Sequence, residues 1–463
     1  MREALLATLP QTLEDVAAIT GGRLVQGSPV APYAGVSIDS RTLRKEELFF
    51  AIAGPRFDGH DFVDDAARRG AAAAVVHRDV PGAGLPLVRV ADTATALQAL
   101  GRETRRRAAI RVVAITGSVG KTTTKEMAAA LLAKRGPVLK TEGNLNNRYG
   151  LPLTLLRLQA RHAAAALELG MSAPGELRVL AGIAQPDVAV ITRIAPVHLE
   201  FFASLEAIAD AKAEILEGLR PDGTAVLNGD DPLQRARGAR PGRVVWFGHD
   251  RRLDVSAENW RGSAAGMRFD LVIEGKKHDV ALPLAGAHFV ENFLAAAAAV
   301  WALGVPPETI AATAHDLAPA RHRGELLRLG EDVVVVDDCY NSNPVAVEAA
   351  LDALKLAGER RRVAILGDML ELGATGPALH RKAGERAAAT ARLVVGVGPL
   401  AAELVAGAAP HAETRHYADA AAAAAAVAEL VQPGDAVLVK GSRGVGLESV
   451  VEALSARFGR ERR

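Results

Sequence analysis

The sequence has little cysteine and no excess of charge of either sign. Cys339 is the only cysteine in 463 residues, which excludes an intramolecular disulfide framework and a cysteine-rich zinc site and indicates a reducing compartment. Lysine and arginine number 55 against 54 acidic residues, for a net charge of +1. We therefore expect no nucleic-acid partner, because a protein that grips nucleic acid electrostatically needs a basic excess.

Long hydrophobic runs are also missing. No apolar stretch approaches the ~18–20 residues that cross a bilayer, and the N-terminal stretch carries acidic residues early and lacks the apolar core of a signal peptide. These absences predict a cytoplasmic protein without a membrane span. The 49% of apolar residues that are present suffice for buried cores and exclude disorder for most of the chain.

The pattern of apolar runs changes twice along the chain, which predicts three domains at residues 1–108, 109–318 and 319–463. The first domain holds short apolar runs and helical stretches, and the charge-rich segment 102–107 is expected to be a helical connector. In the other two, short β-branched runs alternate with helical patterns, which favours mainly parallel sheets covered on both faces. The strands predicted there are 112–116, 164–169, 187–194, 224–227, 244–247, 333–336, 363–366, 393–397 and 436–439.

Two further features complete the predicted α/β fold. Residues 253–284 alternate in polarity around a turn at 274–276, which predicts antiparallel hairpins appended to the central parallel sheet. The third domain reads as Rossmann-like, and the first as a small α/β domain. Functional groups in such sheets lie at the carboxyl ends of strands, where the third domain carries Asp337, Asp338, Asp368, Lys440 and Arg443.

The strongest chemical signal is a glycine-containing loop between a predicted strand and a predicted helix. Its residues are Thr116, Gly117, Ser118, Val119, Gly120, Lys121, Thr122 and Thr123. Glycines let backbone amides face phosphate oxygens, Lys121 supplies a cation, and the Thr122 hydroxyl can ligate Mg²⁺. Ile115 stands where the usual string has its first glycine, and the alternative is a glycine turn with an exposed lysine. We interpret the loop as a phosphate loop of an ATPase-like domain.

Lys212 occupies an apolar stripe. The segment 204–219 has the pattern of an amphipathic helix capped by Ser204, and Lys212 fills a position where the stripe should continue. An inward cation must be paired, deprotonated or modified, or it reaches out to solvent. Glu168 lies near the end of the predicted strand 164–169, and His198 follows the predicted strand 187–194. With Thr122 they form a candidate metal cluster beside the phosphate loop.

Several strings together resemble the Mur ligase family of peptidoglycan synthesis over essentially the whole chain. They are residues 39–41, 57–62, 116–127, 143–152, 167–176, 198–202, 211–215, 228–231, 337–344, 367–373 and 440–443. Within that family, the Lys-Glu pair at 125–126, the asparagine-rich segment 143–152 and the segment 337–344 favour the branch that adds D-alanyl-D-alanine. No single string is specific, but their combination is.

The resemblance implies roles for individual residues. Lys121, Lys212, His198, Arg323 and Asp338 would be catalytic, and Lys212 would be carbamylated. Thr122, Glu168, His198 and Lys212 would hold Mg²⁺, two ions in all. Residues 116–123, Asn292 and Arg323 would bind ATP. Ser40 and Arg41 would contact the uridine end, and Asn144, Asn146 and Asn147 the muramoyl-peptide.

The sequence departs from the family pattern at a few of these places. His322 replaces a usual glycine before Arg323, which leaves Arg321 as a rival for the same role. Arg193 and Ala195 stand where asparagine and glycine are common, and Cys339 replaces serine or alanine.

The implied reaction joins D-Ala-D-Ala to UDP-N-acetylmuramoyl-tripeptide through an acyl phosphate, in a monomeric enzyme that supports cell-wall synthesis, cell shape and division. Lys121, Mg²⁺ and Arg323 would offset the developing charge, and His198 is a candidate base. A Mur ligase that adds the third residue and a folylpolyglutamate synthetase share this chemistry. A non-catalytic P-loop interaction module would bind ATP without acceptor-dependent phosphate release.

Overall fold

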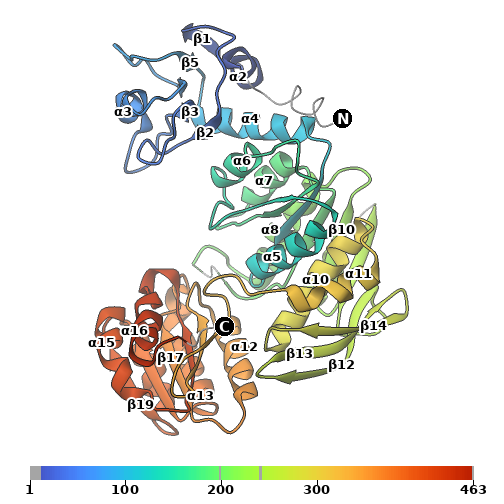
Figure 1. Cartoon of the computed structure of the whole chain (residues 1–463), viewed down its shortest axis with the longest axis vertical. Helices are drawn as coiled ribbons and strands as arrows, with labels where there is room; N and C mark the ends of the chain where they lie inside the picture. Colours follow the sequence, from blue (N-terminus) through green and yellow to red (C-terminus); the bar gives the residue numbers. More distant parts are fainter. Residues whose placement is uncertain (1–11, 198–199, 239–241, 461–463) are drawn as a thin grey trace.

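The computed structural model describes residues 12–197, 200–238 and 242–460. It contains three α/β domains, each built on one sheet, and Figure 1 shows them arranged along the long axis of the molecule. The first domain is blue, the second green to yellow, and the third orange to red. The predicted three-domain α/β architecture is confirmed. In the described part of the chain, no helix is long and apolar enough to cross a membrane.

The first domain holds a five-stranded sheet in the order β1-β5-β4-β3-β2, in which only β1 runs antiparallel to its neighbour. Its strands are β1 (Arg23–Gln26), β2 (Gly35–Ser37), β3 (Glu47–Phe50), β4 (Ala73–Val76) and β5 (Leu87–Arg89). Its helices are α2 (Leu13–Thr20), α3 (Val63–Arg68) and α4 (Thr93–Arg107). Asp92 begins α4 by accepting a hydrogen bond from the amide of Thr95, as helix N-caps do.

The last turn of α4 ties the first domain to the second. Arg105 is fully buried and donates to Asp187 Oδ2 over 2.9 Å and to the carbonyl oxygen of Ala184 over 2.9 Å. The helical connector predicted at residues 102–107 is therefore the last turn of α4, and Arg105 packs it against the second domain. A buried charge is tolerated only when it is paired and hydrogen-bonded, and Arg105 meets both conditions.

The second domain has a nine-stranded sheet in the order β14-β13-β12-β11-β10-β9-β6-β8-β7. The strands are β6 (Arg111–Thr116), β7 (Val138–Lys140), β8 (Ala164–Glu168), β9 (Val188–Ile191), β10 (Thr224–Asn228), β11 (Arg243–Gly248), β12 (Val255–Ser263), β13 (Gly266–Ile273) and β14 (Lys276–Leu282). From β7 to β12 all pairs are parallel, whereas β12, β13 and β14 form the predicted antiparallel hairpins.

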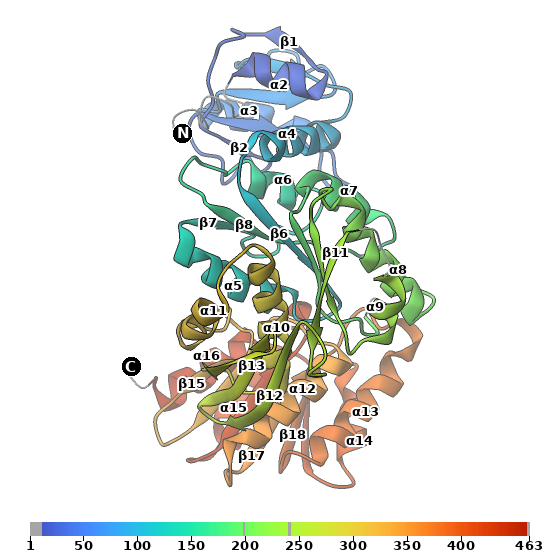
Figure 2. The same ribbon diagram turned by 90° about the vertical axis from the view of Figure 1, so that its right-hand side faces the viewer.

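Helices cover both faces of this sheet, as Figure 2 shows. They are α5 (Lys121–Leu132), α6 (Gly150–Leu155), α7 (Glu176–Ala184), α8 (Leu205–Ala213), α9 (Pro232–Arg237), α10 (Ala287–Ala302) and α11 (Pro307–Thr313). Separate apolar cores contain α5 and α10 on one face and α7 and α8 on the other. The alanine run Ala295–Ala299 is completely buried in α10, which lets this helix pack closely against the sheet.

The third domain has a six-stranded sheet in the order β15-β16-β20-β17-β18-β19, and only β15 is antiparallel. Its strands are β15 (Glu325–Arg328), β16 (Val334–Asp338), β17 (Arg362–Gly367), β18 (Leu393–Val397), β19 (Glu413–Tyr417) and β20 (Ala436–Lys440). Its helices are α12 (Pro344–Leu354), α13 (Gly376–Ala388), α14 (Ala401–Ala408), α15 (Ala420–Leu430) and α16 (Glu448–Phe458). As in the second domain, two apolar cores enclose the sheet.

Candidate active site

A cleft of about 1120 Å³ lies where the three domains meet. Its walls contain parts of the first domain, the phosphate loop, the asparagine-rich segment 143–149, the start of α10, and the loop between β16 and α12. Ligand-binding clefts commonly lie at interfaces between domains, so this cleft is the candidate binding site.

The phosphate loop runs directly from β6 into α5, as predicted. Gly117 and Gly120 have φ values of +148° and +87°, a backbone conformation that residues with a side chain rarely adopt. A Cβ atom at Gly117 would lie 1.9 Å from Thr192 Oγ1, and one at Gly120 would lie 2.2 Å from Asn292 Oδ1. Both glycines are therefore required by shape, and Asn292 borders the loop.

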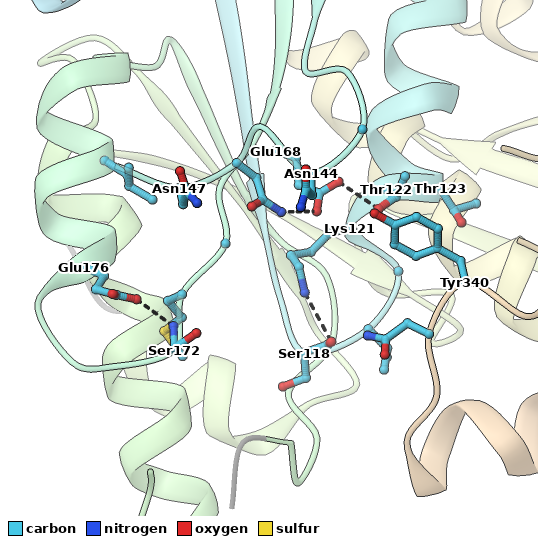
Figure 3. A pocket seen from close by; sticks show the side chains of 18 of the residues that line it. Ser118, Lys121, Thr122, Thr123, Asn144, Asn147, Glu168, Ser172, Glu176 and Tyr340 are labelled. Carbon is cyan, nitrogen blue, oxygen red and sulfur yellow. Dashed lines mark hydrogen bonds between the residues drawn. The ribbon is translucent and has the colours of Figure 1, made fainter. Parts of the chain in front are cut away.

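Lys121 projects from the start of α5 into the cleft. Its Nζ donates to the carbonyl oxygens of Gly117 over 2.7 Å and Ser118 over 3.3 Å, and Figure 3 shows its side chain between Ser118 and Glu168. Burial lowers the pKa of Lys121 below its usual value; the nearby Glu168 carboxylate partly opposes this shift and the Arg323 cation adds to it. No carboxylate in the described residues forms an ion pair with Lys121, so an anionic ligand would supply its counter-charge.

Glu168 lies at the carboxyl end of β8, beside the loop. Its Oε2 accepts from Thr122 Oγ1 over 2.8 Å and its Oε1 accepts from Asn146 Nδ2 over 2.8 Å. Its amide donates to Thr141 Oγ1 over 3.0 Å, which fixes the start of the side chain. Hydroxyl and carboxylate oxygens are the ligands that Mg²⁺ prefers, so the Thr122–Glu168 pair fits that ion.

Arg323 reaches the loop from the segment that precedes β15. Its Nη2 donates to Thr122 Oγ1 over 3.3 Å, and its guanidinium lies 4.2 Å from the ring centre of Tyr340. Its buried Nε has no hydrogen-bond partner among the described residues. Arg321 is exposed and does not line the cleft, so the structure places Arg323 and not its rival at the site.

The carboxyl ends of β16 and β20 contribute a charged pair to the cleft. Lys440 Nζ donates to Asp338 Oδ2 over 2.6 Å, and both residues line the cleft. The other strand-end residues predicted in the third domain do not. Asp368 is buried and accepts from the amide of Ala401, while the exposed Arg443 pairs with Glu448.

Lys212 is buried within α8, as the sequence pattern predicted, with 1% of its surface exposed. The predicted α-helix ends at Ala213 and continues as a 3₁₀-helix over Glu214–Gly218. Among the described residues, no group forms a hydrogen bond or ion pair with the Lys212 amine. Burial, reinforced by the charge of Lys121, holds the pKa of Lys212 well below its usual value. This shift favours the uncharged form of the amine, and Lys212 is not among the residues that line the cleft.

Of the remaining site residues predicted from the sequence, some line the cleft and others do not. His198 lies outside the described residues. Asn144, Asn146 and Asn147 line the cleft, and the Asn147 side chain also accepts from the amides of residues 149 and 150. Ser40 and Arg41 do not line it.

Ser40 is buried in the first domain, and the exposed Arg41 pairs with Asp39. The first domain instead brings other residues to the cleft, namely Ala53, Asp92, Ala94, Thr95 and Gln98. The capping signal at Asp92 could have located the start of α4, but not its position in the wall of the cleft.

Four further residues line the cleft that the sequence did not identify as site residues: Arg193, His288, Glu291 and Tyr340. Glu291 accepts from Asn228 Nδ2 over 2.9 Å and pairs with Arg193 over 3.4 Å. Burial lowers the pKa of His288 to about 4, so this imidazole is neutral near pH 7.

Comparisons with known proteins agree over the whole chain. The chain matches three family models: the Mur ligase family catalytic domain over residues 32–105, the Mur ligase middle domain over 115–300, and the Mur ligase glutamate ligase domain over 322–443. The UDP-N-acetylmuramoyl-tripeptide--D-alanyl-D-alanine ligase of Escherichia coli (strain K12) is 38% identical, covering 96% of this chain and 98% of the relative. The ligase of the same name from Bacillus subtilis (strain 168) is 37% identical, covering 91% of this chain and 93% of the relative.

Solved structures give the same picture. A crystal structure of MurF from Acinetobacter baumannii matches with a TM-score of 0.90 at 32% identity, covering 97% of this chain and 100% of that one. MurF ligase from Thermotoga maritima, solved in complex with ADP, matches with a TM-score of 0.82 at 31% identity, covering 91% and 97%. A folylpolyglutamate synthase from Mycobacterium tuberculosis shares the fold alone, with a TM-score of 0.62 at 18% identity over 80% of this chain and 95% of that one.

Proposed function

The chain belongs to the Mur ligase family, and we propose that it joins D-alanyl-D-alanine to UDP-N-acetylmuramoyl-tripeptide with hydrolysis of ATP to ADP and phosphate. The observation that carries the proposal is the cleft between the domains. In it, Glu168 of β8 and Arg323 from the third-domain side both bond to the Thr122 hydroxyl, and Lys121 of the phosphate loop lines the same cleft. These groups form a site for a nucleotide triphosphate and a divalent cation beside the asparagine-rich wall.

In this proposal the substrates occupy different parts of the cleft. ATP binds residues 116–123, with Asn292 near adenine and Arg323 on the terminal phosphate. Asn144, Asn146 and Asn147 hold the muramoyl-peptide. The uridine end extends beyond the cleft onto the first domain, where Ser40 and Arg41 serve it. We keep the three domains at the boundaries predicted from the sequence, 1–108, 109–318 and 319–463.

Thr122 and Glu168 are proposed to hold one Mg²⁺, and Lys212 with His198 to hold a second. Lys212 fits that role only after carbamylation, in which its neutral amine adds to CO₂ and releases a proton, giving a carbamate anion. The pair of Mg²⁺ ions, when bound, reduces the repulsion between carboxylate and phosphate oxygens.

The chemistry must make a poor electrophile reactive. A carboxylate oxygen of the tripeptide attacks the γ-phosphorus of ATP and displaces ADP, while Lys121 and Arg323 offset the negative charge on the transferring group. The resulting acyl phosphate then accepts the amine of D-Ala-D-Ala, and phosphate leaves as the amide forms. His198 is the proposed group that takes the proton from the amine.

Closure of the third domain completes the proposal. Arg323, Asp338 and Lys440 reach the cleft from that side, so they approach ATP as the domain closes. Closure also excludes water from the acyl phosphate, which would otherwise hydrolyse.

We place the enzyme in the cytoplasm as a monomer that supplies peptidoglycan synthesis, and thereby supports cell shape and division.

A panel of acceptors and amines tests the proposed function. Phosphate release is measured with ATP and Mg²⁺ across UDP-N-acetylmuramoyl-dipeptide, UDP-N-acetylmuramoyl-tripeptide and folate. Each acceptor is tested alone, with D-Ala-D-Ala, with glutamate and with other single amino acids. We expect release only when the tripeptide and D-Ala-D-Ala are both present. Turnover with folate and glutamate alone, or with the dipeptide and a single amino acid alone, would replace this assignment by one of its siblings.

A further inference from the structure

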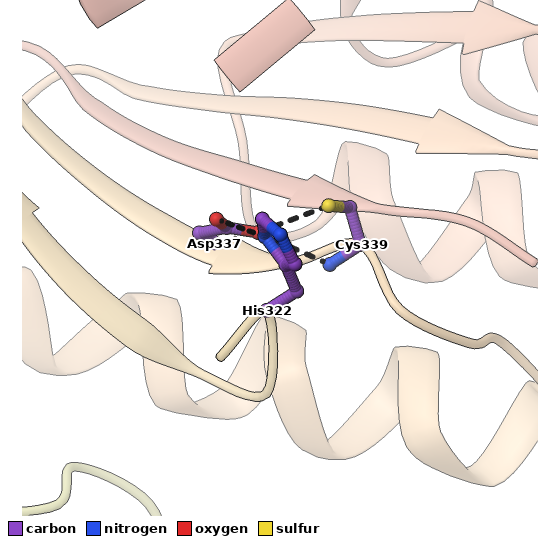
Figure 4. Close-up of side chains that lie close together, drawn as sticks. All are labelled: His322, Asp337 and Cys339. Atoms are coloured by element: carbon purple, nitrogen blue, oxygen red, sulfur yellow. Dashed lines mark hydrogen bonds and ion pairs between the residues drawn. The ribbon is translucent and has the colours of Figure 1, made fainter. Parts of the chain in front are cut away.

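Three buried or half-buried side chains form a cluster beside the active site but face away from it. His322 Nδ1 lies 2.7 Å from Asp337 Oδ2, and Cys339 Sγ donates to Asp337 Oδ1 over 3.0 Å. Figure 4 shows the imidazole and the thiol converging on the carboxylate. Asp337, which the strand-end rule had placed among the functional groups, does not line the cleft. Its side chain instead joins the segment before β15 to the end of β16.

Histidine, aspartate and cysteine are common metal ligands, and the potential ligand atoms of this cluster lie within 4.8 Å of one another. The cluster could therefore be taken for a metal site. Its bonding indicates another role. Both oxygens of Asp337 already accept hydrogen bonds from within the cluster. Burial and the neighbouring Asp337 raise the pKa of the Cys339 thiol, which therefore stays protonated and is a poor metal ligand. The network is complete without an ion.

His322 has an unusual backbone conformation. Its φ is +59°, in the left-handed region where a residue with a Cβ atom is disfavoured. Such a conformation persists when surrounding contacts impose it, and strained residues of this kind gather at functional sites. Here the contacts are the bond to Asp337 and a hydrogen bond from the Tyr340 amide to the His322 carbonyl oxygen over 3.2 Å.

The next residue in the chain is Arg323, which meets Thr122 of the phosphate loop. Its guanidinium stacks on Tyr340, which belongs to the same segment that the cluster anchors. The direction of the Arg323 side chain therefore depends on the backbone of His322 and on the position of the segment after Asp337. A long, flexible arginine directed across a domain junction loses effectiveness if its base is free to rotate.

We propose that His322 is a positioning residue for the ligase reaction: its bond to Asp337 holds the left-handed turn that aims Arg323 at the phosphate loop. The inference rests on the proposed function. His322 contacts no substrate in this account and acts only through Arg323.

A double-mutant cycle tests the proposal in the full-length enzyme. His322→Gly keeps the left-handed backbone accessible but removes the tether, and Arg323→Ala removes the group that is positioned. The kcat/KM for ATP is measured by radiolabelled phosphate release for the wild type, both single variants and the double variant. We expect His322→Gly to lower kcat/KM about 10- to 100-fold in the wild-type background, and to have no further effect when Arg323 is already alanine.

The same loss from His322→Gly in the Arg323→Ala background, or no loss in the wild-type background, would overturn the proposal. The affinity for the UDP-substrate and the circular dichroism spectrum report folding, and Asp337→Asn replaces His322→Gly in the cycle if that variant does not fold. Arg321→Ala, an exposed neighbouring arginine, is the matched control and should behave as the wild type. Absence of wild-type turnover would instead refute the proposed function itself, so the two failures are distinct.

Discussion

Replacing Lys212 with alanine is expected to reduce turnover by about 10³-fold, the scale at which loss of one preorganised charge acts in a desolvated site. The reason is the environment of this residue. Its amine is buried and has no hydrogen-bond or ion-pair partner among the described residues, and its pKa is lowered by burial. A neutral amine is the form that adds to CO₂, and the carbamate is the form that ligates Mg²⁺. Steady-state phosphate release measures the loss.

Rescue separates this role from a structural one. Short carboxylic acids such as acetate should restore part of the activity of Lys212→Ala, because they supply a carboxylate where the carbamate would lie. Lys212→Arg should remain inactive, since a guanidinium is not carbamylated. Asp210→Ala, on the solvent side of the same helix, is the control and should retain activity. A fully active Lys212→Ala variant would remove the carbamate from the account.

The second large effect is expected at the phosphate loop. Lys121→Ala should lower acyl-phosphate formation by about 10²–10³-fold or more, because it removes a preorganised cation from a site where charge develops on the transferring phosphate. Within the described part of the chain, the Lys121 Nζ bonds only to the loop carbonyl oxygens of residues 117 and 118, so ATP phosphates can replace those contacts. Rapid-quench measurement of ADP formed in the first turnover reports this step.

Binding of the UDP-substrate distinguishes a catalytic loss from misfolding. Lys121→Ala should bind UDP-N-acetylmuramoyl-tripeptide with unchanged affinity in calorimetry, because that ligand is proposed to contact the first domain and the asparagine-rich segment. Lys276→Ala, at the exposed start of β14, serves as the control lysine. A first turnover as fast as that of the wild type would show that Lys121 does not act on the phosphate.

Local patterns made much of this fold predictable. A β-branched run followed by glycines located β6, the phosphate loop and α5, and the strand-end rule brought Glu168 to the loop although it is 46 residues from Thr122. The inward lysine of α8 could be read from helical periodicity alone. Strands without an apolar signal were missed: β19 is a polar, largely exposed edge strand, and β7 and β15 are short segments at sheet edges.

Contacts between domains account for most of what the sequence could not predict. Nothing local indicates that Arg105 pairs with Asp187, or that Asp92 and Gln98 of the first domain line the same cleft as the phosphate loop. The bond between His322 and Asp337 likewise joins segments whose meeting depends on the tertiary fold. Ser40 and Arg41 were chosen by resemblance alone, and the structure keeps them out of the cleft.

The central claim is that ATP activates a carboxylate as an acyl phosphate before the dipeptide arrives. It is tested most directly by labelling the reacting carboxylate of UDP-N-acetylmuramoyl-tripeptide with ¹⁸O and analysing the released phosphate by mass spectrometry. Attack of the carboxylate on the γ-phosphorus, followed by loss of phosphate from the acyl carbon, must transfer one labelled oxygen to the phosphate for each amide formed. Unlabelled phosphate alongside the pentapeptide product would contradict the account.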